Sequence, residues 1–224
     1  MKGVLFNVWA PKALSVSVVG EFNKYDGRVH LMERIEDTGV FELFIPGLAA
    51  GCGYMYEIKR QGKGTTRKLD PVSRQISSVP ITASVVSDEN MPDSYAWNDG
   101  LWMIKRKKEA GKKKPVTVYE VSLTDWLKEK SADELVDFVK QEGYTHVCFL
   151  PVAEYLNEEM NGYSTLGYFA VTHRTGGSDA FKKLVDDCHN AGIGVIIDWN
   201  GAYFGTEVKG LYDFDGADAY GYLK

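Results

Sequence analysis

Three short apolar runs, separated from one another by helical patterns, constrain the fold of this chain most strongly. They are Val118-Tyr-Glu-Val-Ser-Leu123, His146-Val-Cys-Phe-Leu-Pro-Val152 and Gly194-Val-Ile-Ile-Asp-Trp-Asn200. Continuous apolar strands are typical of parallel sheets, which are buried on both faces, and the helical crossover between such strands is nearly always right-handed. We therefore predict strands at 116–123, 145–152 and 194–199, as the first βαβαβ units of a (β/α)8 barrel that is truncated after its third strand.

The two intervening helices have clear signals at their ends. Ser131 and Glu134 predict a capping box at the start of the first helix, and Gly143 ends it. The second helix is expected from Ser178, with an apolar stripe at i, i+3, i+4 and i+7 that consists of Phe181, Leu184, Val185 and Cys188. Between the second strand and this helix, residues 153–177 are expected to form a long polar loop.

The first half of the chain follows another pattern, in which short strands alternate with turns. In Leu14-Ser-Val-Ser-Val18 the apolar residues alternate with serine, so we expect Leu14, Val16 and Val18 on one face of a strand. Runs at 40–45 and 54–58 also predict strands. Regular short strands with turns between them favour a β-sandwich without a helix of normal length.

These patterns divide the chain into three parts. We assign residues 1–100 to the sandwich, 101–115 to a basic linker and 116–224 to the partial barrel. The linker contains Lys105-Arg-Lys-Lys108 and Lys112-Lys-Lys114. A solvated linker face is favoured over a patch for nucleic acid or an acidic partner, and nearby Trp97, Trp102 and Met103 are expected to hold the connector against a domain.

Composition and charge argue against several functional classes. The net charge is −5, so no nucleic-acid partner is expected, and no apolar run approaches the roughly 20 residues of a membrane span. The three cysteines, Cys52, Cys148 and Cys188, are odd in number and dispersed, which argues against a disulfide framework or a zinc site and favours the reducing cytoplasm. No motif for a metal or a cofactor is found, so we expect neither.

Six stretches of the chain stand in an order that resembles one enzyme family. They are residues 6–47, Val118–Leu123, Tyr144–Val152, Asn161–Ala170, His189–Trp199 and Gly210–Gly216. Together they resemble the 1,4-α-glucan (glycogen) branching enzymes of the α-amylase superfamily. The first stretch is similar to the carbohydrate-binding module that precedes their barrel, and the others are similar to the first strands and loops of the catalytic domain.

The resemblance implies an immunoglobulin-like glucan-binding module followed by a catalytic barrel that transfers α-1,4 chains to 6-hydroxyls. In the family, the nucleophilic Asp and the general-acid Glu lie at the ends of barrel strands four and five, and both positions lie beyond Lys224. We therefore expect no catalytic residue here and an inactive chain on its own. It is interpreted either as an accessory or α-glucan-binding protein or as the N-terminal fragment of a branching enzyme.

The same resemblance identifies candidate substrate-binding residues. Asp198 is expected to contact a glucose unit or, alternatively, to cap its loop, and Tyr163 is expected to stack on a sugar ring or to pack on the sheet. Tyr203 stands where the family has a histidine, so its donor atom is displaced. Asn23 and Tyr25 lie where the binding modules carry a Phe-Asn-x-Trp turn, with tyrosine in place of tryptophan, and form either a surface glucan contact or a plain turn.

Structural roles are expected for the other conspicuous polar residues. Glu120 is assigned to the barrel interior or to a lysine pair, and His146 to the core. His173 and Arg174 are assigned to loop packing, and Asp186-Asp187 to a helix face.

The partners that we expect are weakly bound α-glucan and other protein chains. Three strands cannot close a barrel, and unpaired sheet edges favour association, so we expect a homodimer or association with a full-length branching enzyme. The alternative is a protein-interaction scaffold that uses the sandwich and the open sheet edge. An exposed Tyr25 among polar groups would favour sugar binding, and a Tyr25 buried at an interface would favour the scaffold.

Overall fold

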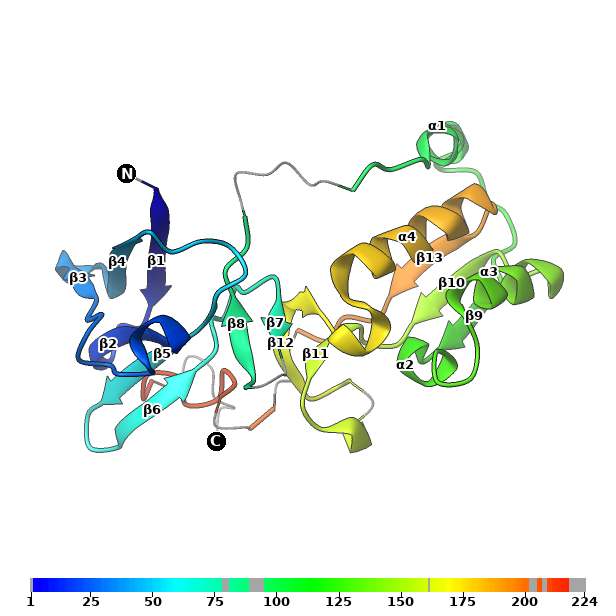
Figure 1. Ribbon diagram of the computed structural model, residues 1–224. Coiled ribbons are helices and arrows are strands. Elements are labelled where there is room, and N and C mark those ends of the chain that lie inside the picture. The colour runs from blue at the N-terminus through cyan, green and yellow to red at the C-terminus, as the bar shows by residue number, and fades with distance from the viewer. Residues whose placement is uncertain are drawn as a thin grey trace.

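The computed structural model describes residues 2–77, 81–88, 95–160, 162–201, 205–206 and 209–217. In these ranges the chain forms a β-rich N-terminal half and an α/β C-terminal half, joined by a hairpin and by a helical connector (Figure 1). The coarse prediction of a β-domain followed by α/β structure is confirmed. None of the described helices is long and apolar enough to cross a bilayer.

Two antiparallel sheets form the N-terminal half. One has the strand order β1 (Gly3–Trp9), β4 (Val40–Pro46) and β3 (Glu33–Ile35). The other has the order β2 (Ala13–Gly20), β5 (Gly53–Arg60), β8 (Ala83–Val85) and β7 (Ile76–Ser77), with β6 (Gly64–Lys68) also paired to β5. Their shared core includes Phe6, Val16, Val18, Phe41, Tyr56 and Ile58.

Strand β2 departs from the predicted alternation at its first residues. Val16 and Val18 are fully buried, whereas Leu14 is 57% exposed. The pairing with β5 shifts register between Ala13 and Ser15, and a bulge of this kind turns one side chain away from its expected face. The prediction that Leu14 shares the core face with the two valines is therefore wrong.

The C-terminal half contains the predicted parallel sheet. Strands β9 (Val118–Val121), β10 (His146–Phe149) and β13 (Gly194–Ile197) lie in the order β13-β10-β9, with both pairs parallel. Helices α3 (Ala132–Gln141) and α4 (Gly177–Asn190) lie along one face of this sheet (Figure 1). The short helix α2 (Leu123–Trp126) follows β9.

Helix α3 begins as its sequence predicts. The Ser131 hydroxyl accepts a hydrogen bond from the Glu134 amide, and a Glu134 carboxylate oxygen accepts one from the Ser131 amide at 2.7 Å. Its apolar stripe packs with the sheet and with α4 in a core that includes Leu135, Val139, Val147, Phe149 and Leu184. The capping box and the helix are confirmed.

The opposite face of the parallel sheet carries apolar side chains that remain open to solvent. Val118 and Ile196 are exposed there, Glu120 is exposed beside them, and Cys148 is half-buried. Since alternate residues of a strand share a face, these side chains point away from α3 and α4. Glu120 forms no ion pair with a lysine within the described ranges, so its predicted lysine pairing is not observed.

Residues 153–177 form a hairpin, so the prediction of a long polar loop is wrong. Strands β11 (Ala153–Tyr155) and β12 (Thr165–Val171) pair antiparallel with irregular register. The 3-10 turn η3 (Glu158–Met160) lies between them, and the 3-10 turn η4 (His173–Thr175) follows β12. Leu166 and Ala170 pack with residues of the sandwich, namely Val19, Met55, Leu69, Ile76 and Ala83. The hairpin depends on this tertiary packing, which a local pattern does not report.

The basic linker contains a helix, α1 (Gly100–Glu109), which sequence analysis did not predict. The Trp102 ring stacks on His189 of α4 at 5.0 Å, and His189 Nδ1 contacts Asp99 Oδ2 at 2.8 Å. The buried carboxylate of Asp186 accepts a hydrogen bond from the Asn98 amide at 3.0 Å. The predicted anchoring role is confirmed for Trp102, whereas Met103 is exposed.

Residues 209–217 return to the N-terminal sandwich. Phe214 is 1% exposed in the sandwich core. Asp213 pairs with Arg60 at 2.7 Å and with Lys63 at 2.8 Å, and Asp215 accepts a hydrogen bond from the Lys12 amide at 2.9 Å. Residues about 200 positions apart in sequence thus share one core.

We expect Phe214→Ala to lower the free energy of unfolding by about 3–5 kcal/mol, because it leaves a cavity in the sandwich core. Phe169→Ala provides the matched control, since Phe169 is 61% exposed and should cost well under about 1 kcal/mol. Urea unfolding of both variants measures the difference. Equal destabilisation would show that the C-terminal segment does not pack as described.

Candidate functional site

The side chains of Tyr163 and Asp198 meet at the carboxyl ends of the parallel strands. Asp198 directly follows β13, and its amide donates to the Phe149 carbonyl of β10 at 2.9 Å. The Tyr163 hydroxyl donates to Asp198 Oδ2 at 2.5 Å. Ligands of α/β enzymes bind at this end of a parallel sheet, so the pair lies where a site is expected.

Gly162 places Tyr163 beside the sheet. Its φ is +85°, and a Cβ at this position would lie 2.8 Å from the Pro151 carbonyl oxygen, so the residue needs both the left-handed conformation and the absence of a side chain. The Tyr163 amide then donates to the Met160 carbonyl at 2.8 Å. The loop between β11 and β12 is thereby turned toward Asp198.

The electrostatics of this pair are dominated by negative charge. The hydrogen bond to Asp198 is the main cause that raises the pKa of Tyr163 to about 12, with smaller contributions from burial and from Glu120. Burial, followed by Glu120 and Asp198, also raises the pKa of the Cys148 thiol. The phenol of Tyr163 therefore stays protonated near neutral pH.

A groove of about 170 Å³ lies next to this pair. It lies between the hairpin and the end of β13, and its lining includes Asp198, Trp199, Asn200, Thr165, Tyr168 and Phe169. Trp199 is 59% exposed and meets the Tyr168 ring edge-on at 5.6 Å. Aromatic faces next to a carboxylate and an amide suit a ligand that is apolar on one side and rich in hydroxyls on another.

Of the predicted site residues that the structure describes, Tyr163 and Asp198 are brought together at the groove. Tyr203 lies outside the described residues. Asn23 and Tyr25 belong to the turn after β2 in the sandwich, and neither residue lines the groove. No group of three or more His, Cys, Asp or Glu side chains in the described part of the chain is placed to hold a metal ion.

Asn23 uses its amide inside the protein. It ends the 3-10 turn η1 (Glu21–Asn23) and is buried. Its Oδ1 accepts from the Gly20 amide at 2.9 Å, and its Nδ2 donates to the Val18 carbonyl at 2.8 Å. These bonds hold the turn in place.

Tyr25 is half-buried at the junction between the sandwich and the hairpin. Its ring packs against the cluster that contains Met55 and Leu166. The Arg67 guanidinium lies 5.8 Å from the ring centre and donates to the Tyr25 carbonyl at 2.9 Å. The backbone φ of Tyr25 is +58°, which is unusual for a residue with a side chain.

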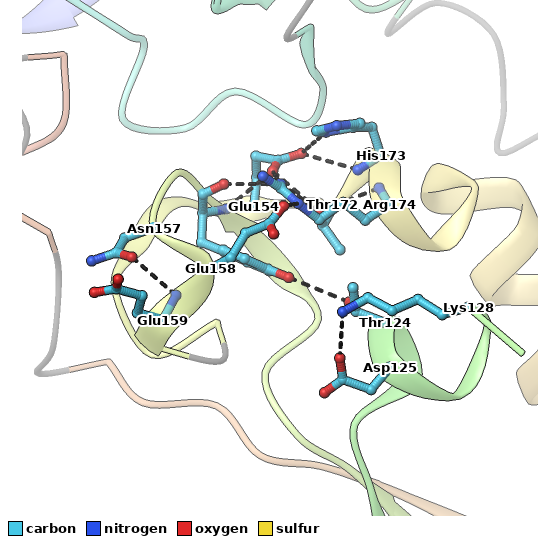
Figure 2. A network of polar contacts seen from close by, with 11 residues as sticks. Thr124, Asp125, Lys128, Glu154, Asn157, Glu158, Glu159, Thr172, His173 and Arg174 are labelled. Carbon is cyan, nitrogen blue, oxygen red and sulfur yellow. Dashed lines mark hydrogen bonds and ion pairs between the residues drawn. The ribbon is translucent and has the colours of Figure 1, made fainter.

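A buried carboxylate that no local sequence pattern marks, Glu154, organises the hairpin (Figure 2). Glu154 is 2% exposed. Its Oε1 accepts from Thr172 Oγ1 at 3.1 Å and from Arg174 Nη1 at 2.9 Å, and its Oε2 accepts from the His173 amide at 3.0 Å. His173 and Arg174 thus pack the loop, as predicted, whereas nothing in the local pattern marks Glu154 as buried.

The comparisons with known proteins agree with the resemblance seen in the sequence. Residues 1–73 match the family described as Carbohydrate-binding module 48 (Isoamylase N-terminal domain). The chain is 42% identical over 228 residues to the 1,4-alpha-glucan branching enzyme GlgB of Nitrosococcus oceani, covering 97% of this chain and 30% of that protein. For the GlgB of Gloeobacter violaceus the identity is 43% over 230 residues, with 97% and 31% covered.

Solved structures give the same relationship at the level of the fold. A structure assigned as an α-amylase from Salmonella typhimurium has a TM-score of 0.69 at 25% identity, covering 92% of this chain and 33% of that one. The catalytic module of the pneumococcal glycogen-degrading virulence factor SpuA has a TM-score of 0.62 at 22% identity, with 88% and 35% covered.

The pKa of Tyr163 gives a direct test of the pair. We expect Asp198→Asn to lower the Tyr163 pKa from about 12 toward about 10, the ordinary value, because the carboxylate that favours the protonated phenol is removed. The pKa of Tyr163 is higher in the folded chain than in the unfolded one. The Tyr163–Asp198 hydrogen bond therefore contributes fully to folding stability below pH 10, and this contribution is lost as the pH rises through 12. The difference in tyrosinate absorbance between the wild type and Tyr163→Phe isolates the titration of Tyr163. A Tyr163 pKa that is unchanged in Asp198→Asn would contradict the hydrogen-bonded pair.

The Glu154 network predicts a large effect on stability. Glu154→Ala leaves Arg174 without its buried partner and should cost about 3 kcal/mol of unfolding free energy. Glu158→Ala is the matched control, because Glu158 contacts the same arginine at 3.3 Å from an exposed position and should cost at most about 1 kcal/mol. Denaturant unfolding compares the two, and similar costs would exclude the proposed role of Glu154.

The chain spans about 30% of the length of these curated relatives. Over nearly all of its own length it is similar to 1,4-α-glucan branching enzymes, and its first third matches a carbohydrate-binding module, so the resemblance read from the sequence is confirmed.

Proposed function

We propose that this chain is an α-glucan-binding unit of branching-enzyme type, and that its groove beside Tyr163 and Asp198 binds the glucan. The observation that carries the proposal is the exposure of Trp199 and Phe169 next to a carboxylate–phenol pair. Two further findings support it. Residues 1–73 match a carbohydrate-binding family, and the relatives at 42–43% identity are named for 1,4-α-glucans.

The chemistry of the groove fits a chain of glucose units. A glucose ring has apolar C–H faces and a rim of hydroxyl groups. The faces of Trp199 and Phe169 supply apolar surface. Tyr163 occupies Oδ2 of Asp198, and a sugar hydroxyl would donate to the other oxygen, which gives a charge-assisted hydrogen bond.

The finer architecture is part of this proposal. The strands β9, β10 and β13 would be the first three strands of an α-amylase-type barrel. Their parallel order, the helices on one face and the exposed apolar residues on the other support this assignment. The side chains of Glu120 and Ile196 would then face the barrel interior.

These 224 residues are proposed to lack glycosyl transfer activity on their own. Retaining transfer needs two carboxyl groups on either side of the glycosidic bond, about 5–5.5 Å apart. The family resemblance assigns neither the nucleophile nor the general acid to a residue of this sequence. Any branching activity would belong to a longer protein that contains such a unit.

Native affinity electrophoresis through gels with and without glycogen tests the binding proposal. We expect glycogen to retard the wild-type chain, and we expect Trp199→Ala to abolish the retardation because it removes an aromatic face of the groove. Trp97→Ala is the matched control, since Trp97 is an exposed tryptophan that does not line the groove. Its retardation should equal that of the wild type.

A third variant separates the groove from the sandwich. Because Tyr25 is packed under Arg67, Tyr25→Ala should leave most of the retardation in place. Retardation that is lost in Tyr25→Ala and kept in Trp199→Ala would move the site to the sandwich. No retardation of the wild-type chain would rule out glucan binding by these residues.

A further inference from the structure

The outer face of the sheet β1-β4-β3 forms a shallow apolar groove. It has a volume of about 620 Å³ and is lined in part by Leu5, Leu31, Ile35 and Phe44. All four side chains are exposed, although residues of this kind are usually covered when they gather on one face. We call this surface the sandwich groove.

The sandwich groove is also acidic. Three glutamates, Glu33, Glu36 and Glu42, line it together with one basic residue, Arg34. None of the three glutamates forms an ion pair among the described residues. Glu33 of β3 stands directly opposite Glu42 of β4 in the sheet register. Like charges in this position destabilise a strand pair, and a cation bound between them would relieve the repulsion.

Helix α1 carries apolar and basic side chains that complement the apolar and acidic lining of the sandwich groove. Trp102 faces α4, so Leu101, Ile104 and Lys108, at i, i+3 and i+7, lie on the outward side. Leu101 is 82% exposed, Ile104 is exposed, and Lys107 lies beside them. Within the described residues, Lys107 and Lys108 have no acidic partner, whereas Lys114 pairs with Glu109.

The dimensions of the two surfaces agree. Helix α1 has 10 residues, so it is about 15 Å long. Strand β4 has seven residues and spans about 23 Å. The helix can therefore lie on the sheet face with its apolar residues over Leu5 and Phe44 and its lysines near the glutamates.

The two surfaces cannot meet within one chain. The contacts of Asp186 and His189 fix the start of α1 to α4. The strands β1, β4 and β3, which carry the sandwich groove, lie at the other end of the molecule from α1 (Figure 1). We propose that α1 of one copy binds the sandwich groove of a second copy, so that the chain associates with itself through an apolar and charge-complementary contact.

Charge reversal on each surface tests this contact. We expect the wild-type chain to self-associate in sedimentation velocity, more weakly as salt is raised, because the Debye length falls from about 10 Å at 0.1 M to about 3 Å at 1 M. The double variant Glu33→Lys with Glu42→Lys and the double variant Lys107→Glu with Lys108→Glu should each weaken association by about tenfold or more, equivalent to about 1.4 kcal/mol. Glu33, Lys107 and Lys108 are exposed and Glu42 is half-buried, so circular dichroism checks that the fold is kept.

Mixing the two variants gives the decisive measurement. The basic helix of one then meets the acidic groove of the other, and the acidic helix meets the basic groove, so association should return in the mixture. Lys112→Glu with Lys113→Glu, just beyond α1, is the matched control and should associate like the wild type. Three outcomes would each overturn the proposal. The wild-type chain could be monomeric at all concentrations, both charge-reversal variants could associate as strongly as the wild type, or the mixture of the two variants could stay monomeric.

Discussion

The arrangement of the two halves depends on the hydrogen bonds and the ion pair of one buried carboxylate, that of Glu154. It accepts hydrogen bonds from the end of β12 and from η4 and pairs with Arg174, so it closes the hairpin at the edge of the parallel sheet. A buried charge is tolerated only when its partners are in place. The closed hairpin can then pack Leu166 and Ala170 on the sandwich, which joins one core to the other.

The same hairpin forms one wall of the candidate groove. Its loop brings Tyr163 to Asp198, and β12 supplies Tyr168 and Phe169 opposite Trp199. The aromatic residues of the groove and those of the sandwich turn that contains Tyr25 differ in solvent accessibility. In the groove Phe169 and Trp199 are open to solvent, whereas Tyr25 is packed against the hairpin, with Arg67 near its ring. This contrast is why we propose the groove, rather than the turn of the sandwich, as the glucan site.

Charge is distributed unevenly over the chain, although the net value is only −5. Carboxylates gather in the sandwich groove and near Asp198, and lysines gather on α1. Because exposed charges interact over about 10 Å at moderate salt, such separate patches act on different partners. We infer a neutral, hydroxyl-rich ligand at one of them and a second copy of the chain at another.

Local patterns in the sequence located the elements whose signals are local. The Ser131–Glu134 capping box depends on neighbouring residues, and each strand carries its apolar pattern within a few residues, although its pairing partners are distant in sequence. Residues distant in sequence decided the rest. The β11–β12 hairpin packs on the sandwich, α1 is anchored through His189, Glu154 is buried by partners about 20 residues away, and Leu14 turns outward at a register shift with β5. Periodicity and capping signals report on a few adjacent turns, whereas burial, register and pairing between distant side chains exist only once the chain has folded.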